Sequence, residues 1–357
     1  MLKAAVVGCG GIANGKHIPA IKKIKDVEIV ALCDIKPESL ESTAKDHGLE
    51  NAKKYADYNE MLKSEKLDIV YVLTPNSSHA PISIAAMEAG CHVMCEKPMA
   101  KTSEQAKAML ECAKKTGKIL TIGYQNRFRP DSLYLKRTCE RGDLGEIYFA
   151  KSHATRRRAV PTWGVFLDAE AQGGGPLIDI GTHALDMTLW MMDNYEPKSV
   201  RGNVYRKLAD QTETGNTFGE WDPKEFTVED SAFAFITMKN GATIVLESSW
   251  ALNTLDADEA KVTLCGTAAG ADMRDGLRIN KADFGKLITT KPDLSSGGVA
   301  FYDGGSDAAE DVEARQFIDC VKNGGTPVVT PEQAYAVTQI LEAIYESAKL
   351  GKEIELS

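Results

Sequence analysis

The chain has 357 residues, of which 43% are hydrophobic, and a formal net charge of -9 at pH 7. This length predicts about two domains, and the apolar content is sufficient for a core in each. The acidic balance argues against nucleic acid or an anionic membrane as a partner, because both require clustered lysine and arginine. The one dense basic run, three arginines at 156–158, is too short to follow a phosphate backbone.

Location, redox state and metal content are also predicted at this level. No segment approaches ~20 consecutive apolar residues, so no membrane-spanning helix is expected. The first predicted strand begins at residue 2, which leaves no room for a cleaved export signal and indicates a cytoplasmic protein with reduced thiols. Cys91-His92-Val93-Met94-Cys95 could suggest a metal site, but alternate residues of a strand point to opposite faces and no second ligand pair follows. We expect no bound metal.

Residues 1–123 alternate between strand-like and helix-like segments. Amphipathic stretches such as 103–116 separate apolar runs at 4–7, 27–33, 68–73, 92–95 and 119–122. Pro37 stands where a helix should begin, and Gly48, Gly90 and Gly117 stand where helices should end. Strand–helix alternation predicts a parallel sheet with helices on both faces, which is a Rossmann domain.

Residues 124–357 have a different pattern. Helices are predicted near 131–140, at 176–192, at 307–322 and at 331–350, the last two with the option of packing near the first domain. Strands are predicted at 147–154, 198–206, 228–238, 242–251, 259–266, 269–273, 276–281 and 286–290, and a mobile loop at 293–305. We expect an α+β domain with a large, mostly antiparallel open sheet. Its apolar face must be covered, which predicts a homodimer or homotetramer through this sheet.

The first candidate site is a glycine-rich loop after the first strand. Gly8, Gly10 and Ala13 form a Gly-x-Gly-x-x-Ala pattern in which the helix start binds a pyrophosphate. Asp34 ends the second apolar run, where its carboxylate would bind a ribose 2′-OH and repel a 2′-phosphate. The pattern predicts NAD rather than NADP, although Lys36 leaves some room for NADP. The alternative is a plain glycine turn.

Lys97 follows the fifth strand in Glu96-Lys97-Pro98. The carboxyl ends of parallel strands face the ligand crevice, so we expect Lys97 to lie beside the nicotinamide. The Lys-Pro bond is a candidate for the cis form. A partly desolvated lysine near a cationic ring suits proton exchange with a hydroxyl. A solvated lysine at a helix start is the alternative, and position alone does not decide between them.

Asp179 and His183 follow the glycine run 173–175 at positions i and i+4 of a predicted helix, so they share one face. A histidine with a pKa near ~6.5 is a natural acceptor for a hydroxyl proton. The aspartate can hold a sugar hydroxyl or orient the imidazole. A helix-surface ion pair explains the same spacing.

These motifs together resemble the Gfo/Idh/MocA oxidoreductase family over essentially the whole chain. The segments that carry the resemblance are the opening fingerprint, Thr74-Pro-Asn76-Ser-Ser-His79, Glu96-Lys97-Pro98, Gly123-Tyr124-Gln-Asn126-Arg127-Phe128, and the glycine run to Asp179 and His183. The resemblance implies that Lys97, Asp179 and His183 form the catalytic set, with His183 as proton acceptor.

The resemblance also implies a cofactor and a substrate set. The implied cofactor residues are Gly8, Gly10, Gly11, Ile12, Asp34, Thr74, Asn76, His79, Glu96, Lys97 and Asn126. The implied substrate residues are Lys97, Tyr124, Arg156, Trp163, Asp179 and His183. Arg127 either lies where the domains meet or forms a structural ion pair. The arginines at 156–158 either bind substrate, an anionic one if all three face the cleft, or form a solvated basic loop.

The leading functional hypothesis is an NAD-dependent dehydrogenase acting on a ring hydroxyl of a sugar, glycoside or cyclitol. A glycosidase or epimerase of the same family, which oxidises its substrate transiently, is the second hypothesis. A non-catalytic NAD-sensing regulator is the third. It is disfavoured because Lys97, Asp179 and His183 are all present, and function follows the site rather than the fold.

Overall fold

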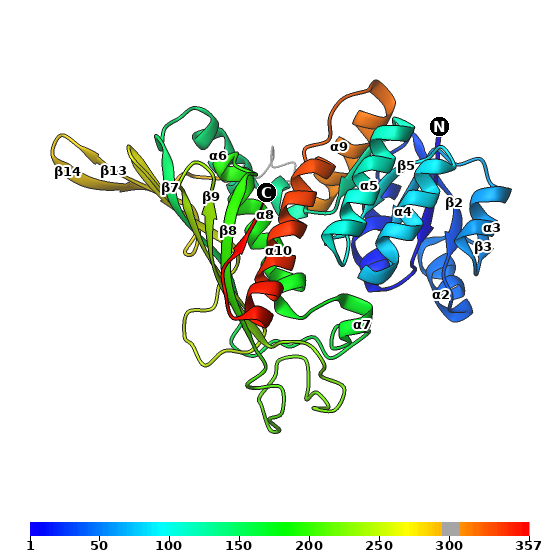
Figure 1. The fold of residues 1–357 in the computed structure, drawn as a ribbon. Helices are drawn as coiled ribbons and strands as arrows, with labels where there is room; N and C mark the ends of the chain where they lie inside the picture. Colours follow the sequence, from blue (N-terminus) through cyan, green and yellow to red (C-terminus); the bar gives the residue numbers. More distant parts are fainter. Residues whose placement is uncertain (295–307, 357) are drawn as a thin grey trace. The chain divides into compact units, whose positions relative to one another are not determined.

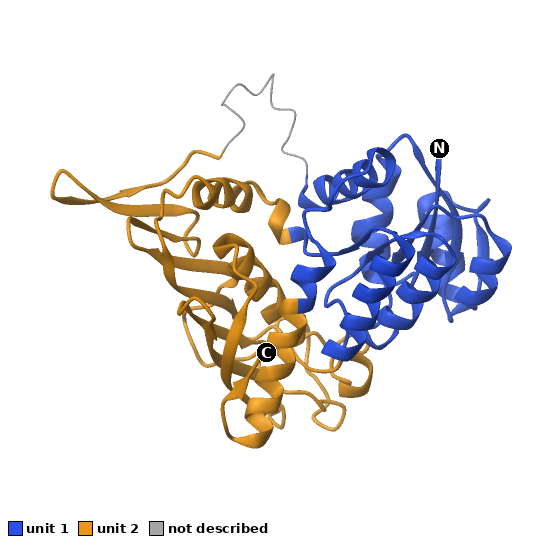
Figure 2. Ribbon diagram, turned by 45° about the horizontal axis from the view of Figure 1, so that its top comes forward, with its two compact units in different colours: residues 1–125, 307–335 blue, residues 126–306, 336–357 orange. Residues whose placement is uncertain are grey.

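A computed structural model describes residues 1–294 and 308–356 of the chain. Contacts divide it into two compact units, residues 1–125 with 307–335 and residues 126–306 with 336–357 (Figure 2). Each unit contains its own β-sheet (Figure 1). The loop predicted at 293–305 lies almost entirely outside the described residues.

The sheet of the first unit has six strands in the order β3-β2-β1-β4-β5-β6, all parallel, which confirms the predicted Rossmann architecture. The strands are β1 (Leu2–Val7), β2 (Val27–Cys33), β3 (Lys53–Tyr55), β4 (Ile69–Val72), β5 (His92–Cys95) and β6 (Leu120–Ile122). The helices are η1 (Ala13–His17), α1 (Ile18–Lys22), α2 (Pro37–His47), α3 (Tyr58–Ser64), η2 (Asn76–Ser78), α4 (His79–Glu88), α5 (Ser103–Thr116) and α9 (Ala309–Asn323).

Local chemistry fixes several of these boundaries. Helix α2 begins at Pro37 and ends before Gly48, which adopts the left-handed conformation that suits glycine. The Thr102 hydroxyl caps α5 by accepting a hydrogen bond from the Gln105 N–H. All four residues of β4 are buried, as expected for a central strand of a parallel sheet.

Helix α9 packs on the first unit, although about two hundred residues separate it from that unit's last strand. Phe317 is fully buried and contacts Tyr71 of β4 edge to face, with ring centroids 5.9 Å apart. Asp311 binds Lys23, with 2.5 Å between Oδ2 and Nζ. The apolar face of α9 therefore completes the core of the parallel sheet.

The second unit contains a nine-stranded sheet in the order β14-β13-β12-β11-β7-β10-β9-β8-β15, antiparallel except for the β7–β10 pair. This confirms the predicted mostly antiparallel open sheet. The strands are β7 (Ile147–Thr155), β8 (Pro197–Tyr205), β9 (Ser231–Met238), β10 (Thr243–Ser249), β11 (Glu259–Gly266), β12 (Ala269–Asp272), β13 (Arg278–Asp283), β14 (Lys286–Thr290) and β15 (Ile354–Glu355). The helices, including two that begin in the first unit, are η3 (Gln125–Phe128), α6 (Pro130–Glu140), α7 (Ala169–Gln172), η4 (Leu177–Gly181), α8 (Thr182–Met192) and α10 (Pro331–Leu350).

Strand β9 starts at Ser231, three residues later than the pattern predicts, and the side chains of the two residues before it bind other segments. The Asp230 carboxylate accepts hydrogen bonds from the main-chain N–H groups of Leu208 and Ala209. The Glu229 carboxylate accepts hydrogen bonds from the main chain before η4. The two acidic side chains therefore hold the loop at 208–209 and the start of η4.

A buried ion pair fixes α8, which packs on β7 and β11 (Figure 1). Arg127 is completely buried, and its guanidinium contacts both carboxylate oxygens of Asp186, at 2.9 and 2.6 Å. The same guanidinium lies 5.3 Å above the Trp190 ring. Of the two roles considered for Arg127, the structure favours the structural ion pair.

Candidate active site

The glycine loop of the first unit fits a dinucleotide. Gly8 has φ +94°, and a Cβ there would lie 2.6 Å from the Leu73 carbonyl oxygen, so only glycine fits this turn. A Cβ on Gly10 or Gly11 would meet nothing within 4 Å, so the backbone above η1 is open to a phosphate group. Ile12, which precedes this helix, is 42% exposed.

Asp34 is held in one orientation. Its Oδ2 accepts the Cys9 N–H at 2.7 Å, and its Oδ1 accepts the Lys36 N–H at 2.8 Å. Because both oxygens are bound to main chain, the carboxylate cannot turn aside to admit a 2′-phosphate. A carboxylate oxygen has a second lone pair, so each can still accept a ribose hydroxyl. The geometry fits NAD.

Glu96 connects the glycine-loop helix to the Lys97 turn. Its Oε1 accepts hydrogen bonds from Lys16 Nζ at 2.8 Å and His17 Nε2 at 2.7 Å, and its Oε2 accepts the Lys97 N–H at 3.0 Å. Burial alone would raise the pKa of Glu96, but the Lys16 charge and the His17 hydrogen bond outweigh it and hold this pKa well below its usual range. A Cβ on Gly123 would lie 3.2 Å from this carboxylate. The Lys97–Pro98 peptide bond is cis.

The segment that follows β4 is tied to the same turn. His79 is completely buried, with Nδ1 2.8 Å from the Pro98 carbonyl oxygen and Nε2 2.9 Å from the Thr74 carbonyl oxygen. Burial lowers the pKa of His79. Asn76 is buried at the start of η2, and Thr74 is half-buried. His79 therefore joins the turns after β4 and β5, and direct contact of these residues with a cofactor stays a prediction.

In the second unit, Asp179 and His183 lie on one continuous helical segment. Asp179 belongs to η4, a single π-helical turn, and His183 to the first turn of α8. His183 is buried and Asp179 is half-buried. A single π turn inside a helix is frequent at functional sites, and the same feature forms η1 after the glycine loop.

The glycine run before Asp179 allows close packing. A Cβ on Gly174 would lie 1.9 Å from the Tyr345 hydroxyl oxygen, and one on Gly175 would lie 2.3 Å from the Glu229 carbonyl oxygen. The Glu229 side chain accepts the Gly175 N–H at 2.9 Å and the Tyr345 hydroxyl at 2.8 Å. This carboxylate therefore anchors the beginning of the helix that carries the candidate catalytic pair.

Trp250 contacts Asp179 and is absent from the residues predicted from sequence. Its side chain is completely buried, and its indole Nε1–H donates to Asp179 Oδ2 at 3.0 Å. This hydrogen bond fixes the orientation of the Asp179 carboxylate. Trp250 lies 71 positions from Asp179, beyond β10, so no local pattern marks it.

Four further residues are predicted from the sequence to bind substrate or cofactor: Arg156, Trp163, Tyr124 and Asn126. Arg156 donates from Nε and Nη2 to the two oxygens of Glu259, at 2.6 and 2.8 Å, so its charge is already matched. Trp163 is 53% exposed and contacts Phe218 edge to face at 4.9 Å. Tyr124, a predicted substrate residue, is completely buried in the first unit. Asn126 lies in η3, half-buried.

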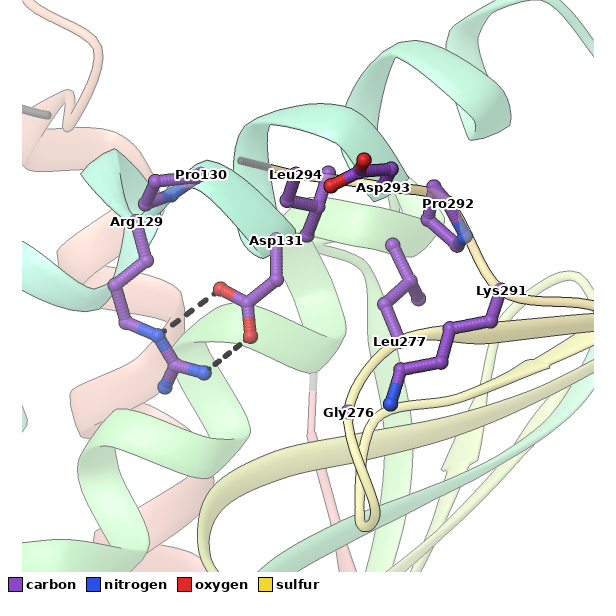
Figure 3. A pocket seen from close by; sticks show the side chains of 9 residues that line it. All are labelled: Arg129, Pro130, Asp131, Gly276, Leu277, Lys291, Pro292, Asp293 and Leu294. Carbon is purple, nitrogen blue, oxygen red and sulfur yellow. Dashed lines mark hydrogen bonds and ion pairs between the residues drawn. The ribbon is translucent and has the colours of Figure 1, made fainter. Parts of the chain in front are cut away.

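A cavity of about 630 Å³ in the second unit contains none of the predicted site residues (Figure 3). Arg129 and Asp131 at its wall bind each other, with 3.1 Å between Nε and Oδ1. Its lining is Arg129, Pro130, Asp131, Gly276, Leu277, Lys291, Pro292, Asp293 and Leu294. Because Arg129 and Asp131 pair with each other and no predicted site residue lines this cavity, we do not place the active site there.

All eight cysteines are free thiols. Within residues 1–294 and 308–356, no group of three or more His, Cys, Asp or Glu side chains could hold a metal ion. The helices of this part of the chain are each too short or too polar to cross a bilayer.

Residues 2–124 match the family model described as "Oxidoreductase family, NAD-binding Rossmann fold", and residues 136–356 match "Oxidoreductase family, C-terminal alpha/beta domain", both of the Gfo/Idh/MocA family. The chain is 38% identical over 355 residues to D-glucoside 3-dehydrogenase of Escherichia coli, covering 99% of this chain and 97% of the relative. It is 27% identical over 201 residues to inositol 2-dehydrogenase of Salmonella paratyphi B, covering 56% of this chain and 57% of the relative. These matches confirm the oxidoreductase class and the cofactor predicted from the sequence.

The fold is shared with solved structures. Levoglucosan dehydrogenase in complex with NADH and levoglucosan superimposes with a TM-score of 0.83 at 22% identity, covering 99% of each chain. Aldose-aldose oxidoreductase from Caulobacter crescentus has a TM-score of 0.80 at 24% identity, again covering 99% of each chain. At these identities the similarity supports the fold alone.

Replacing Trp250 by phenylalanine should lower kcat of the oxidoreductase reaction by roughly tenfold to a hundredfold, because a hydrogen bond to a charged carboxylate contributes about 1.5–3 kcal/mol. Steady-state kinetics of W250F measures the loss. W221F is the matched control, because the buried Trp221 indole donates to the Ala209 carbonyl instead. Equal losses in the two variants would show that Trp250 acts through packing alone.

Proposed function

Because the chain belongs to the Gfo/Idh/MocA oxidoreductase family, we propose that it oxidises a ring hydroxyl of a sugar, glycoside or cyclitol with NAD as hydride acceptor. The proposal draws most support from the presence of Lys97 in the turn after β5, together with Asp179 and His183 on one helix. The chain is an oxidoreductase acting on CH–OH groups. The proposal adds the class of substrate and the transfer of a hydride to the nicotinamide.

The first unit binds the cofactor. The main-chain N–H groups after Gly10 hold the pyrophosphate, and the Asp34 carboxylate accepts the ribose hydroxyls of the adenosine half. The Lys97 turn, fixed by Glu96, faces the nicotinamide half. When bound, NAD⁺ accepts a hydride at C4 of the nicotinamide.

His183, Asp179 and Lys97 act on the substrate alcohol. His183 accepts the hydroxyl proton as the C–H bond of the carbinol carbon breaks, so the alcohol leaves as a ketone. Asp179, oriented by Trp250, accepts a hydrogen bond from a sugar hydroxyl. Lys97 donates to the reacting oxygen and stabilises the negative charge that develops there.

The charge of Arg156 is matched within the second unit, so this arginine does not require an anionic substrate. Glu259 occupies both arms of the Arg156 fork, and the Arg158 guanidinium donates to the Arg157 carbonyl and the Asn253 side chain. Glu259 therefore neutralises Arg156, whereas the uncharged acceptors around Arg158 leave its positive charge in place. The similarity to D-glucoside 3-dehydrogenase makes a D-glucoside the first substrate to test.

We further propose that the open face of the nine-stranded sheet pairs with a second copy of the chain. Ala234, Ile236, Ile244 and Leu246 point to the covered face and are buried. The alternate side chains, Phe149, Phe233, Phe235 and Val245, lie on the opposite face and are half-buried or exposed. Neighbouring apolar side chains on an open sheet face are typical of a subunit interface.

Replacing His183 by alanine, or Lys97 by methionine, should reduce NADH production with methyl glucosides, free sugars and inositols by at least about a hundredfold, because general acid–base groups contribute typically 10²–10⁴-fold. The affinity for NAD⁺, measured by isothermal titration, should change little for H183A, because the proposed cofactor-binding residues are mostly in the other unit. Near-normal turnover in either variant would contradict the proposed roles.

The variant F235E should sediment as a monomer, since Phe235 is 50% exposed on the open sheet face and a carboxylate buried in an apolar interface carries a large desolvation cost. The natural sequence should sediment as a dimer or tetramer. F284S, which removes a 99% exposed phenylalanine at the β13–β14 turn, is the control and should keep the natural assembly. A natural chain that is monomeric at micromolar concentration would refute the interface.

A further inference from the structure

Glu313 of α9 is a buried acid that the proposed mechanism does not use. It is 3% exposed, and its Oε2 lies 3.1 Å from Lys16 Nζ. Its Oε1 is buried with no hydrogen-bond partner among the described residues. Lys16 also donates to Glu96 at 2.8 Å and to the Gln125 side chain at 3.3 Å. Three acceptors therefore use the three N–H groups of one lysine.

The contacts form a continuous path from α9 to the turn that carries Lys97. Glu313 contacts Lys16, Lys16 binds Glu96, and Glu96 accepts the main-chain N–H of Lys97. All four residues belong to the first unit, and the side chains of Glu313, Lys16 and Glu96 are buried. A charge placed on Glu313 is therefore poorly screened by water at the Lys97 turn.

Glu313, Lys16, His17 and Glu96 form a buried cluster whose net charge depends on Glu313. Glu96 is ionised and Lys16 is protonated, since the charges of Glu313 and Glu96 raise the pKa of Lys16 above its ordinary value although burial opposes this. Burial and the Lys16 charge lower the pKa of His17, which stays neutral and donates to Glu96. These groups sum to zero, so ionised Glu313 would leave one uncompensated negative charge.

Burial, reinforced by the negative charge of Glu96 and opposed by Lys16, raises the pKa of Glu313 to about 7. Glu310 on the same helix adds to this shift. The other titratable group that faces it is Tyr71 of β4, whose pKa is raised by burial and by Glu313. The cluster is therefore neutral in mildly acidic solution and singly negative in mildly alkaline solution.

We propose that Glu313 sets the charge of the cofactor site and thereby its preference for the cationic nicotinamide of NAD⁺ over the neutral ring of NADH. A buried negative charge linked to the Lys97 turn through Lys16 and Glu96 attracts the cationic ring and does nothing comparable for the neutral one. The inference rests on the cofactor half of the proposed function, in which Lys97 faces the nicotinamide. It does not depend on the choice of substrate.

The proposal is tested by measuring the dissociation constants of NAD⁺ and NADH separately at about pH 6 and about pH 8, without substrate. In the natural protein the ratio Kd(NADH)/Kd(NAD⁺) should rise roughly threefold to tenfold across this interval, as Glu313 ionises. E313Q keeps the acceptor for Lys16 but cannot ionise. It should hold the low ratio at both pH values.

D311N is the matched control, because Asp311 is a second buried acid of α9 that binds Lys23 and not the Glu96 cluster. It should show the same rise as the natural protein. A rise in E313Q equal to that of the natural protein, or no rise in the natural protein, would overturn the proposal. Because binding is measured without turnover, failure here leaves the proposed hydride transfer to be judged by its own assay.

A stability measurement covers the case in which a variant folds poorly. A carboxyl group whose pKa is raised on folding destabilises the folded state as pH rises from its unfolded value, near ~4.3, to its folded value. The free energy of unfolding in urea of the natural protein, relative to that of E313Q, should therefore fall as the pH rises to about 7. The same slope in both proteins would also overturn the assignment.

Discussion

The first unit depends on one buried ionised carboxylate, that of Glu96. A charge without water must be matched by donors in fixed places, and here Lys16, His17 and the Lys97 N–H supply them. Two of these donors belong to η1, which follows the glycine loop, and the third to the turn after β5. The helix after the glycine loop and the turn that carries Lys97 therefore cannot move independently without leaving a buried charge unpaired.

In the second unit, the buried carboxylate of Glu229 likewise joins separate segments of the chain. Its carboxylate accepts main-chain N–H groups before η4 and the Tyr345 hydroxyl, so it fixes the start of the helix that carries Asp179 and His183. Trp250 then fixes the Asp179 carboxylate itself. In each unit, a buried acid joins segments that are distant in sequence, Glu96 binding η1 and Glu229 binding the start of η4. This rigidity suits the proposed hydride transfer, which requires donor and acceptor carbons in line.

The sequence predicts what local patterns encode. Alternating apolar runs predict the parallel sheet, and spacing from the glycine loop predicts Asp34, whose carboxylate the structure finds fixed at the edge of the fingerprint. Patterns cannot predict partners separated by long stretches of chain. Trp250 is 71 positions from Asp179, and Glu259 is 103 from Arg156, so neither the orientation of the aspartate nor the neutralisation of the arginine follows from either segment.

The most direct test of the proposed hydride transfer uses D-glucosides deuterated at single ring carbons, incubated with NAD⁺ and the purified protein. The account predicts that one labelled position yields NADH one mass unit heavier, with deuterium at C4 of the nicotinamide and a keto-glucoside as co-product. Label retained in the sugar at every position, with no reduced cofactor formed, would contradict net oxidation of a ring hydroxyl in these substrates.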